Sequence, residues 1–336
     1  MKRSDRREKP RTAPAAVWKE KESLGGRQVD AGVIILQTAG CSHFHAGGCS
    51  MCGYNIDARG DVTAQDIVAQ FEQAVRELGD VGMLKVYTSG SFLDTGEVPD
   101  EAAEHILRHC AESGRRLLFE SRPEYIDEER LDRALGTHKD VEVAIGLESA
   151  NDLVLRHSVN KGFTVGDYDR AADLLARKGA DLRTYVLLKP PYLTEAEAVA
   201  DAIATVKHAA VKGKVVSLNP VNVQKGTVVE KLWKTWAYRP PWLWSVLAVL
   251  NAASRTGCRV VCDPTGGGKE RGAHNCGGCD EVVLAGIKAF SQHQDRSRLA
   301  RPECACREVW EGVMDLEGHI VGGTADLQRF FRKHLD

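Results

Sequence analysis

The sequence has no long apolar run and no excess of charge of either sign. Its 336 residues contain 45 Lys and Arg against 47 Asp and Glu, which gives a formal net charge of -2. A balance so close to neutral does not by itself indicate a nucleic acid, a membrane surface or an acidic substrate as the partner. The longest apolar stretch, residues 242–253, is too short to cross a bilayer. We therefore expect no membrane partner.

The sequence also lacks the apolar leader of a secreted protein. Residues 1–22 carry charges throughout, so we expect no signal peptide and a location in the reducing cytoplasm. Ten cysteines are unusual there, and all but Cys110 fall in two groups. Disulfide scaffolds are usually short chains, whereas clustered cysteines in a long chain indicate metal binding.

A chain of this length is typical of about two domains, or of one large α/β barrel with an extension. Residues 1–28 are rich in Lys and Arg and have little apolar periodicity, which predicts a basic, flexible arm. From there β-rich runs alternate with helical patterns, as is typical of a parallel sheet. The β-rich runs are 33–37, 84–88, 116–120, 141–147, 182–188 and 215–218. The pattern over residues 29–232 therefore predicts either a doubly wound sheet or a partial (βα)6 barrel, and periodicity does not choose between them.

Residues 233–336 form a third region, in which the alternation stops. It begins with Trp233, Trp236, Trp242 and Trp244, which either pack as an apolar lid or present aromatic faces on which nucleic-acid bases stack. The remainder is rich in Gly and Cys and has too little apolar periodicity for a core of its own. A bound metal would compensate for that deficit.

Three cysteines with the spacing C-x7-C-x2-C lie directly after the first expected strand. Cys41, Cys49 and Cys52 stand on a Gly-rich loop. Three thiolates on a flexible loop suit a [4Fe-4S] cluster, which needs soft ligands and here leaves one iron open for a further ligand. The alternative is a zinc ion with His43 or His45 as the fourth ligand.

Four more cysteines form two close pairs, Cys276 with Cys279 and Cys304 with Cys306. Two such pairs suit a tetrahedral zinc site with four thiolate ligands. Cys262 or His274 lies close enough in the sequence to replace a member of the second pair. A second iron–sulfur cluster is the alternative to zinc.

With its first triad the sequence resembles the radical S-adenosylmethionine (SAM) superfamily. Over nearly its whole length it resembles the archaeosine synthase radical SAM subunits, with the Elongator catalytic subunit as a more distant likeness. The resemblance implies an α/β fold, a partial (βα)6 radical SAM barrel with a cysteine-rich, zinc-binding C-terminal extension, in which Cys41, Cys49 and Cys52 bind a [4Fe-4S] cluster and SAM binds its open iron. Two features depart from the common pattern: the first gap of the triad has seven residues, as in the Elongator-like branch, and Met51 stands where an aromatic residue usually precedes the third cysteine.

Further matches lie at the ends of the expected strands, where a barrel builds its site. The resemblance implies that the residues binding SAM are Met51, Ser89, Gly90, Ser91, Glu120, Glu148, Ser149 and Lys161. The loop of residues 89–91 has one glycine where the superfamily's motif has two, and it has no acid. Lys161 stands where relatives carry arginine, and it could pair with the SAM carboxylate as a point charge.

Lys189, Asn219 and Gln224 follow the last two expected strands. They lie in segments that resemble signatures of the archaeosine subunits, and we expect them to face the substrate in the catalytic site. Amide side chains both donate and accept hydrogen bonds, and lysine can hold a carboxylate or a phosphate. The alternative is that these are turn residues whose side chains face the surface.

The resemblance implies a lyase that acts on tRNA. A radical formed from SAM would remove a hydrogen atom from a lysine adduct of preQ0 in the tRNA D-loop, and cleavage of a C–N bond would then leave archaeosine. The expected partners are the tRNA, the archaeosine synthase subunit that transfers the lysine, and an electron donor. The alternatives are another Elongator-like radical SAM RNA-modifying enzyme and a noncatalytic zinc-dependent RNA-binding protein.

Overall fold

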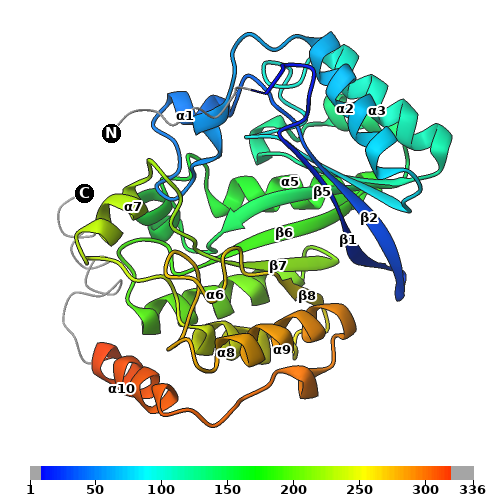
Figure 1. Ribbon diagram of the computed structural model, residues 1–336. Helices are drawn as coiled ribbons and strands as arrows, with labels where there is room; N and C mark the ends of the chain where they lie inside the picture. Colours follow the sequence, from blue (N-terminus) through cyan, green and yellow to red (C-terminus); the bar gives the residue numbers. More distant parts are fainter. Residues whose placement is uncertain (1–8, 319–336) are drawn as a thin grey trace. The chain divides into compact units, whose positions relative to one another are not determined.

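The computed structural model describes residues 9–318, and the chain divides into two compact units (Figure 1). Unit 1 comprises Met1–His45, Tyr54–Ala144 and Lys178–Ala180, and unit 2 comprises Ala46–Gly53, Ile145–Arg177 and Asp181–Asp336. The boundary near residue 232 that the sequence pattern suggested stays a prediction.

Eight strands follow one another in the sheet in the order of the sequence. Their bounds are β1 Ala16–Leu24, β2 Arg27–Ile35, β3 Met83–Tyr87, β4 Arg116–Glu120, β5 Val141–Glu148, β6 Asp181–Leu188, β7 Val215–Pro220 and β8 Arg259–Cys262. β1 is antiparallel to β2, whereas β2 to β5 and β6 to β8 pair in parallel. A doubly wound sheet reverses its strand order at a switch point, and this order never reverses. The α/β fold with a barrel-type strand order is confirmed.

The helices lie between these strands and after them. Their bounds are α1 Ser42–His45, α2 Ala64–Leu78, α3 Asp100–Ser113, α4 Glu128–Thr137, α5 Val165–Lys178, α6 Glu195–Ala210, α7 Val228–Lys234, α8 Leu243–Ala253, α9 Asp280–His293 and α10 Cys306–Gly318. Short 3-10 turns cover Tyr54–Asp57, Pro123–Tyr125 and Arg296–Arg298, and a π-helical turn covers Val154–Val159. In α2 and α6 the threonine before the helix and the acid three residues later form a capping box, which fixes where each helix begins. Within residues 9–318, no helix combines the length and the apolar character needed to cross a membrane.

Strand β1 corrects the expectation of a flexible arm over residues 1–28. It pairs with β2 along its whole length, from Ala16 opposite Ile35 onward. Two acids of β1, Glu20 and Glu22, form ion pairs with the buried Nζ of Lys85 at 2.6 and 2.5 Å. An edge strand commonly carries charged side chains, and these charges hide its apolar alternation in the sequence. Residues 1–8 lie outside the described part of the chain.

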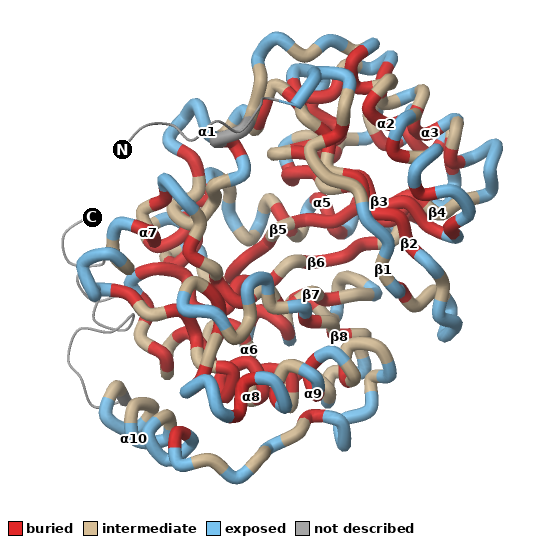
Figure 2. The backbone as a smooth tube through the Cα atoms, in the orientation of Figure 1, coloured by how far each residue is buried: buried red, intermediate tan, exposed pale blue. Residues whose placement is uncertain are grey.

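In unit 2 the cysteine-rich region shares one core with the strands. β8 pairs in parallel with β7, and the core contains Leu218 of β7, Leu247 of α8 and Ile287 of α9. Figure 2 shows α8 buried over most of its length. The sequence pattern missed β8 because this strand is only four residues long.

The four tryptophans of residues 233–244 do not share one environment. Trp244 is buried, and Trp233 and Trp242 are partly buried against the same core. Trp236 is 92% exposed. Packing as a lid therefore accounts for three of these side chains and leaves Trp236 unexplained.

Candidate active site and metal centre

The cysteines of the first triad belong to different units. Cys41 follows β2 in unit 1, where its N–H donates to Oδ1 of Asn55 at 2.6 Å. Cys49 and Cys52 belong to unit 2. Each part of the loop is anchored to its own unit, and the binding of one iron–sulfur cluster by all three thiols stays a prediction.

The part of the loop that ends at Cys52 is held by hydrogen bonds within unit 2. The N–H of Ser50 donates to the carbonyl of Val159 at 2.8 Å. The N–H of Gly53 donates to Oε1 of Gln224 at 2.5 Å. A Cβ atom at Gly53 would lie 3.0 Å from that oxygen, so a larger residue would push the amide away. Gln224, which we expected to face the substrate, thus supports the cysteine loop from a distant part of the sequence.

The loop of residues 89–91, after β3, is organised around the carboxylate of Glu97. All three of its N–H groups donate to Glu97, at 2.8, 3.0 and 2.5 Å. The hydroxyl of Thr38 donates to the same carboxylate at 2.8 Å. A Cβ atom at Gly90 would lie only 2.8 Å from Cα of Cys41, so the loop packs directly on the first cysteine. Glu97 therefore joins the SAM-binding loop expected from the sequence to the segment that carries Cys41.

Glu97 is an acid that the sequence analysis did not single out. It is 2% exposed, and burial raises the pKa of its carboxyl group, while the hydrogen bonds from the loop and from Thr38 oppose that shift. No residue spacing indicates Glu97, because its partners are backbone groups of the preceding loop. An acid bound to three backbone N–H groups can only be recognised once the turn has been built.

In unit 2, two of the expected SAM-binding residues form a buried ion pair. Nζ of Lys161 lies 2.9 Å from Oε1 of Glu148, and each side chain is 10% exposed. Glu148 has a φ of 68°, which is a strained conformation for a residue with a side chain. A Cβ atom at Gly146 would collide with the Glu148 carboxylate and lie 2.9 Å from Lys161 Nζ. Strain and close packing at a strand end are typical of a functional site.

The other expected SAM-binding residues lie at three places. The hydroxyl of Ser149, which is fully buried, donates to Oδ1 of Asp201 at 2.7 Å, and burial raises the pKa of Asp201 to about 6. Glu120 ends β4, and its carbonyl accepts from the N–H of Phe92 at 2.8 Å. Met51 is partly buried against the core of unit 2. Ser149 thus has an internal partner that occupies its hydroxyl.

Lys189, an expected substrate-facing residue, is part of a buried network. Its Nζ lies 2.6 Å from Oε2 of Glu195, whose side chain is 1% exposed. Oε1 of Glu195 accepts from the hydroxyl of Ser245 at 2.5 Å, and Nε1 of Trp310 donates to that hydroxyl at 2.9 Å. Lys189 has a φ of 64°, a second strained strand end. Asn219, the third expected residue, lies half-buried on β7.

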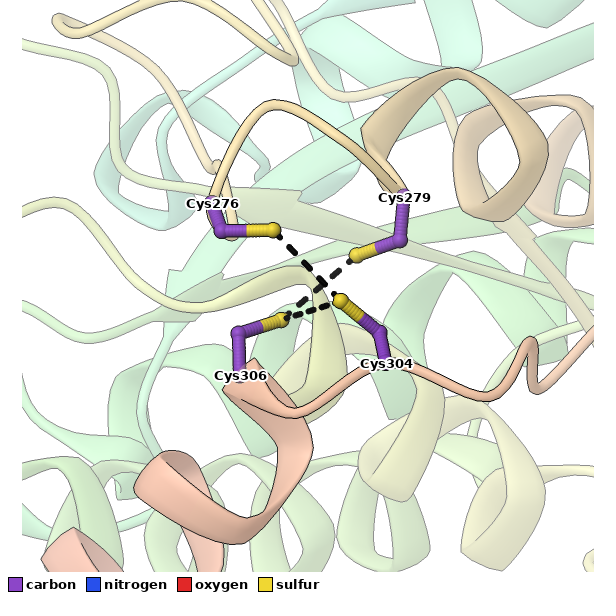
Figure 3. Close-up of side chains that lie close together, drawn as sticks. All are labelled: Cys276, Cys279, Cys304 and Cys306. Atoms are coloured by element: carbon purple, nitrogen blue, oxygen red, sulfur yellow. Dashed lines mark hydrogen bonds between the residues drawn. The ribbon is translucent and has the colours of Figure 1, made fainter.

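The four cysteines of the second cluster meet in unit 2 (Figure 3). Their Sγ atoms all lie within 4.8 Å of one another. The separations are 3.5 Å for Cys276 and Cys304, 3.6 Å for Cys279 and Cys306, and 3.3 Å for Cys304 and Cys306. Four sulfur atoms bound to zinc at about 2.3 Å stand about 3.8 Å apart in a tetrahedron. The four thiols therefore fit a tetrahedral metal ion, as the sequence predicted.

Neighbouring groups orient two of these sulfur atoms. Nε1 of Trp244 donates to Sγ of Cys306, and Nδ2 of Asn275 donates to Sγ of Cys279, both at 3.3 Å. Such donors stabilise thiolates and fix their direction toward a metal. Burial raises the pKa of the Cys306 thiol, and a bound cation would oppose that shift by favouring the thiolate.

Cys262 and His274 do not join the cluster. Cys262 is buried on β8, where its N–H donates to Oγ of Ser291 at 2.9 Å. Nδ1 of His274 lies 2.8 Å from the carbonyl oxygen of Gly272. The ligand set that geometry supports is therefore the four cysteines alone.

Comparisons with known proteins agree with this arrangement. A family model described as the radical SAM superfamily matches residues 35–203, and the chain belongs to that superfamily. Membership implies a [4Fe-4S] cluster and SAM as cofactors.

Over 322 residues the chain is 38% identical to archaeosine synthase subunit beta of Methanosarcina acetivorans, covering 93% of each chain. It is also 38% identical to the same subunit of Thermococcus kodakarensis, over 89% of this chain and 96% of that one. Within the superfamily, the chain belongs to the archaeosine synthase subunit beta family. Among solved structures, Elp3 of Methanocaldococcus infernus is similar with a TM-score of 0.45 and 18% identity, over 60% of this chain and 51% of that one.

Replacing Glu97 by glutamine should loosen the loop of residues 89–91. The amide loses the charge that three N–H groups share, so we expect the free energy of unfolding to fall by about 1–3 kcal/mol. We also expect less iron per chain after reconstitution, because the loop packs on Cys41. Chemical denaturation and iron analysis measure the two effects. The exposed Glu104→Gln on α3 is the control, and equal behaviour of both variants would show that Glu97 does not organise the loop.

The protein should bind one zinc ion per chain at Cys276, Cys279, Cys304 and Cys306. Cys304→Ser should lower the zinc content and the unfolding temperature, because three thiolates hold the ion less tightly than four. Cys258→Ser, which lies outside the cluster, is the matched control. Elemental analysis and thermal unfolding are the measurements, and a Cys304→Ser protein that keeps its full zinc content would contradict the ligand assignment.

Proposed function

We propose that this chain is the radical SAM subunit of an archaeosine synthase, a lyase that converts a lysine adduct of preQ0 in the tRNA D-loop to archaeosine by radical cleavage of a C–N bond. The observation that carries the proposal is the 38% identity to an archaeosine synthase subunit beta over 93% of each chain. This match extends well beyond residues 35–203, the segment that matches the superfamily model. It therefore includes the four-cysteine centre and the Lys189 network as well as the cysteine triad.

In this proposal Cys41, Cys49 and Cys52 hold a [4Fe-4S] cluster, which supplies the electron that cleaves SAM into methionine and a radical able to remove hydrogen from the substrate. The chain's own residues would bind and orient SAM and the substrate, and they would exclude water from the site. Lys161, whose Nζ lies 2.9 Å from Oε1 of Glu148, would bind the SAM carboxylate as a point charge. The loop of residues 89–91 presents backbone to the ligand because Glu97 fixes its N–H groups on the other side.

On the substrate side, Lys189 is the residue best suited to a carboxylate. Its Nζ lies 2.6 Å from Glu195 and 5.7 Å from the ring centre of Tyr238, and its side chain is 10% exposed. The lysine part of the adduct carries a carboxylate that an ammonium can hold. Asn219 is half-buried on β7, the strand next to the one that Lys189 follows, and it offers an amide for the base.

The partners follow from the same proposal. The relatives are named as subunit beta, which implies a second subunit, and we propose that it transfers the lysine to the base. The base lies inside folded tRNA and has to be exposed before these residues can reach it. A reductant is also required. We propose a reducing, cytoplasmic location, in which cysteine thiols stay reduced and can bind metal.

Mass spectrometry of lysine-modified tRNA tests the proposal. The tRNA is incubated with the reconstituted protein, SAM and a reductant, and we expect the mass of the lysine adduct to be replaced by that of archaeosine. Cys49→Ala should abolish formation of 5′-deoxyadenosine, and Cys258→Ala should not change it, since that thiol is outside both cysteine sets.

The alternatives give different outcomes in the same experiment. An Elongator-like RNA-modifying enzyme would form 5′-deoxyadenosine and leave the lysine adduct intact. A noncatalytic RNA-binding protein would contain zinc but no iron after anaerobic reconstitution. Either result would refute the archaeosine activity.

Replacing Lys189 by methionine should both destabilise the protein and impair turnover. The change leaves the Glu195 carboxylate buried without its ion-pair partner, which costs about 3–5 kcal/mol. The double variant Lys189→Met/Glu195→Gln removes both charges, so we expect most of the stability to return while archaeosine formation stays low. Denaturation curves and the ratio of archaeosine to 5′-deoxyadenosine separate the two effects. Full archaeosine formation by the double variant would show that Lys189 only stabilises the fold.

A further inference from the structure

Trp236 stands in a position that the fold itself does not favour. It follows α7 in a Schellman motif, in which its N–H donates to the carbonyl of Trp233 at 3.1 Å and the N–H of Ala237 donates to that of Leu232 at 2.9 Å. This motif requires a left-handed residue after the helix, usually glycine, and Trp236 has a φ of 62°. A tryptophan there is strained, because its Cβ lies close to the following carbonyl group.

The side chain of Trp236 gains nothing from the fold in return. It is 92% exposed, so its large aromatic surface is left in water. The neighbouring Trp233 lies partly buried under the guanidinium of Arg271, whose Cζ is 4.8 Å from the ring centre. Glycine at position 236 would remove both the strain and the exposed apolar surface. A residue that is unfavourable for folding in two ways is best explained by a contact with a partner.

The surroundings of Trp236 are basic. Lys225 and Lys231 are exposed, and Lys234 and Arg271 are the other cations of this segment. Lys234 and Arg271 share one carboxylate, that of Glu230, at 3.2 and 2.8 Å. Lys225, Lys231 and Lys234 lie in residues 225–236 around α7 (Figure 1), where Glu230 is the one acid, and Arg271 pairs with Glu230. The basic patch consists of Lys225, Lys231, Lys234 and Arg271.

Glu230 is committed to structure and does not cancel the patch. It accepts from the N–H of Gly226 at 2.9 Å and contacts both Arg271 and Lys234. The N–H of Gly226 is the largest of the causes that lower the pKa of Glu230 to about 2. Its side chain is 10% exposed, whereas the side chain of Lys234 is 60% exposed and Lys225 and Lys231 are also exposed, so these three cations meet solvent.

We propose that Trp236 and the basic patch bind single-stranded RNA, with the indole stacked on an unpaired base and the cations on the flanking phosphates. Aromatic rings among lysines are typical of surfaces that bind single strands, because every base has a face for stacking. Protein interfaces are depleted in lysine, so RNA fits this surface better than a protein does. The inference rests on the proposed function in that the RNA is the substrate tRNA. Its D-loop has to be opened for the reaction, and an exposed indole can hold an unstacked base.

Trp236→Gly tests the inference because it should leave stability unchanged or higher and should lower the affinity for tRNA. Glycine relieves the backbone strain, so we expect the unfolding temperature to stay the same or rise. Loss of one stacked base weakens binding by about tenfold. We therefore expect the Kd for unmodified tRNA transcript, measured by filter binding, to rise by about that factor. Trp236→Phe keeps an aromatic ring and should retain most of the affinity. The exposed Trp18→Ala on β1 is the control for loss of an unrelated indole.

The charges are tested by salt dependence. Lys231→Gln should weaken tRNA binding and reduce the slope of log Kd against log salt by about 1. Unchanged tRNA affinity of Trp236→Gly would overturn the inference. So would a variant that binds tRNA normally and loses only the second archaeosine synthase subunit, since the surface would then contact protein.

These measurements separate the inference from the proposed function. Because the assay uses unmodified tRNA and no SAM, it reports on binding alone. If archaeosine is formed and Trp236→Gly binds tRNA like the unaltered protein, only the inference fails. If no archaeosine is formed while Trp236→Gly binds tRNA about tenfold more weakly, the RNA surface stands and the archaeosine activity fails.

Discussion

Parallel strand pairing is the constraint on which the candidate site depends. In each unit the strands run in the same direction from β2 onward, so the loops that follow them leave from the same edge of the sheet. Cys41, residues 89–91 and Glu120 follow strands of unit 1, and Lys161 and Lys189 come after strands of unit 2. Within each unit, the register of the paired strands determines which of these loops are neighbours. The chemistry is added in the loops.

Buried carboxylates then determine the shape of those loops. Glu97 binds the N–H groups of one loop, Glu148 pairs with Lys161, and Glu195 pairs with Lys189. A buried charge without a partner is costly, so each acid forces its neighbours into one arrangement. Glu148 and Lys189 keep left-handed backbone angles within these arrangements. Strained backbone at two strand ends is therefore held in place by nearby charge pairs.

Strands and metal-ligand pairs can be predicted from the sequence because they follow local patterns, whereas contacts between residues far apart in the chain cannot. All six β-rich runs became strands, and the pairs Cys276–Cys279 and Cys304–Cys306 came together, because alternation and ligand spacing are local patterns. Strand β1 was missed because the acids that pair with Lys85 made it resemble a solvated arm. Gln224 was expected at the substrate, and its bond to Gly53 spans 171 positions that no periodicity connects. Glu97 was missed for a different reason: its partners are backbone N–H groups of residues 89–91, which no side-chain pattern marks.

Helix α10 begins at Cys306 and carries Trp310, which donates to the hydroxyl that binds Glu195. A metal ion held by the four cysteines would close the long loop between Cys279 and Cys304 and fix the start of this helix. The ion would then stabilise the hydrogen-bond network around Lys189 without contacting Lys189 itself. Maturation of the protein would then have an order. Until the metal ion is bound, α10 would not hold Trp310 against Ser245, and the network around Lys189 would be incomplete. The supply of this metal would thus govern the readiness of a site whose reaction does not use it.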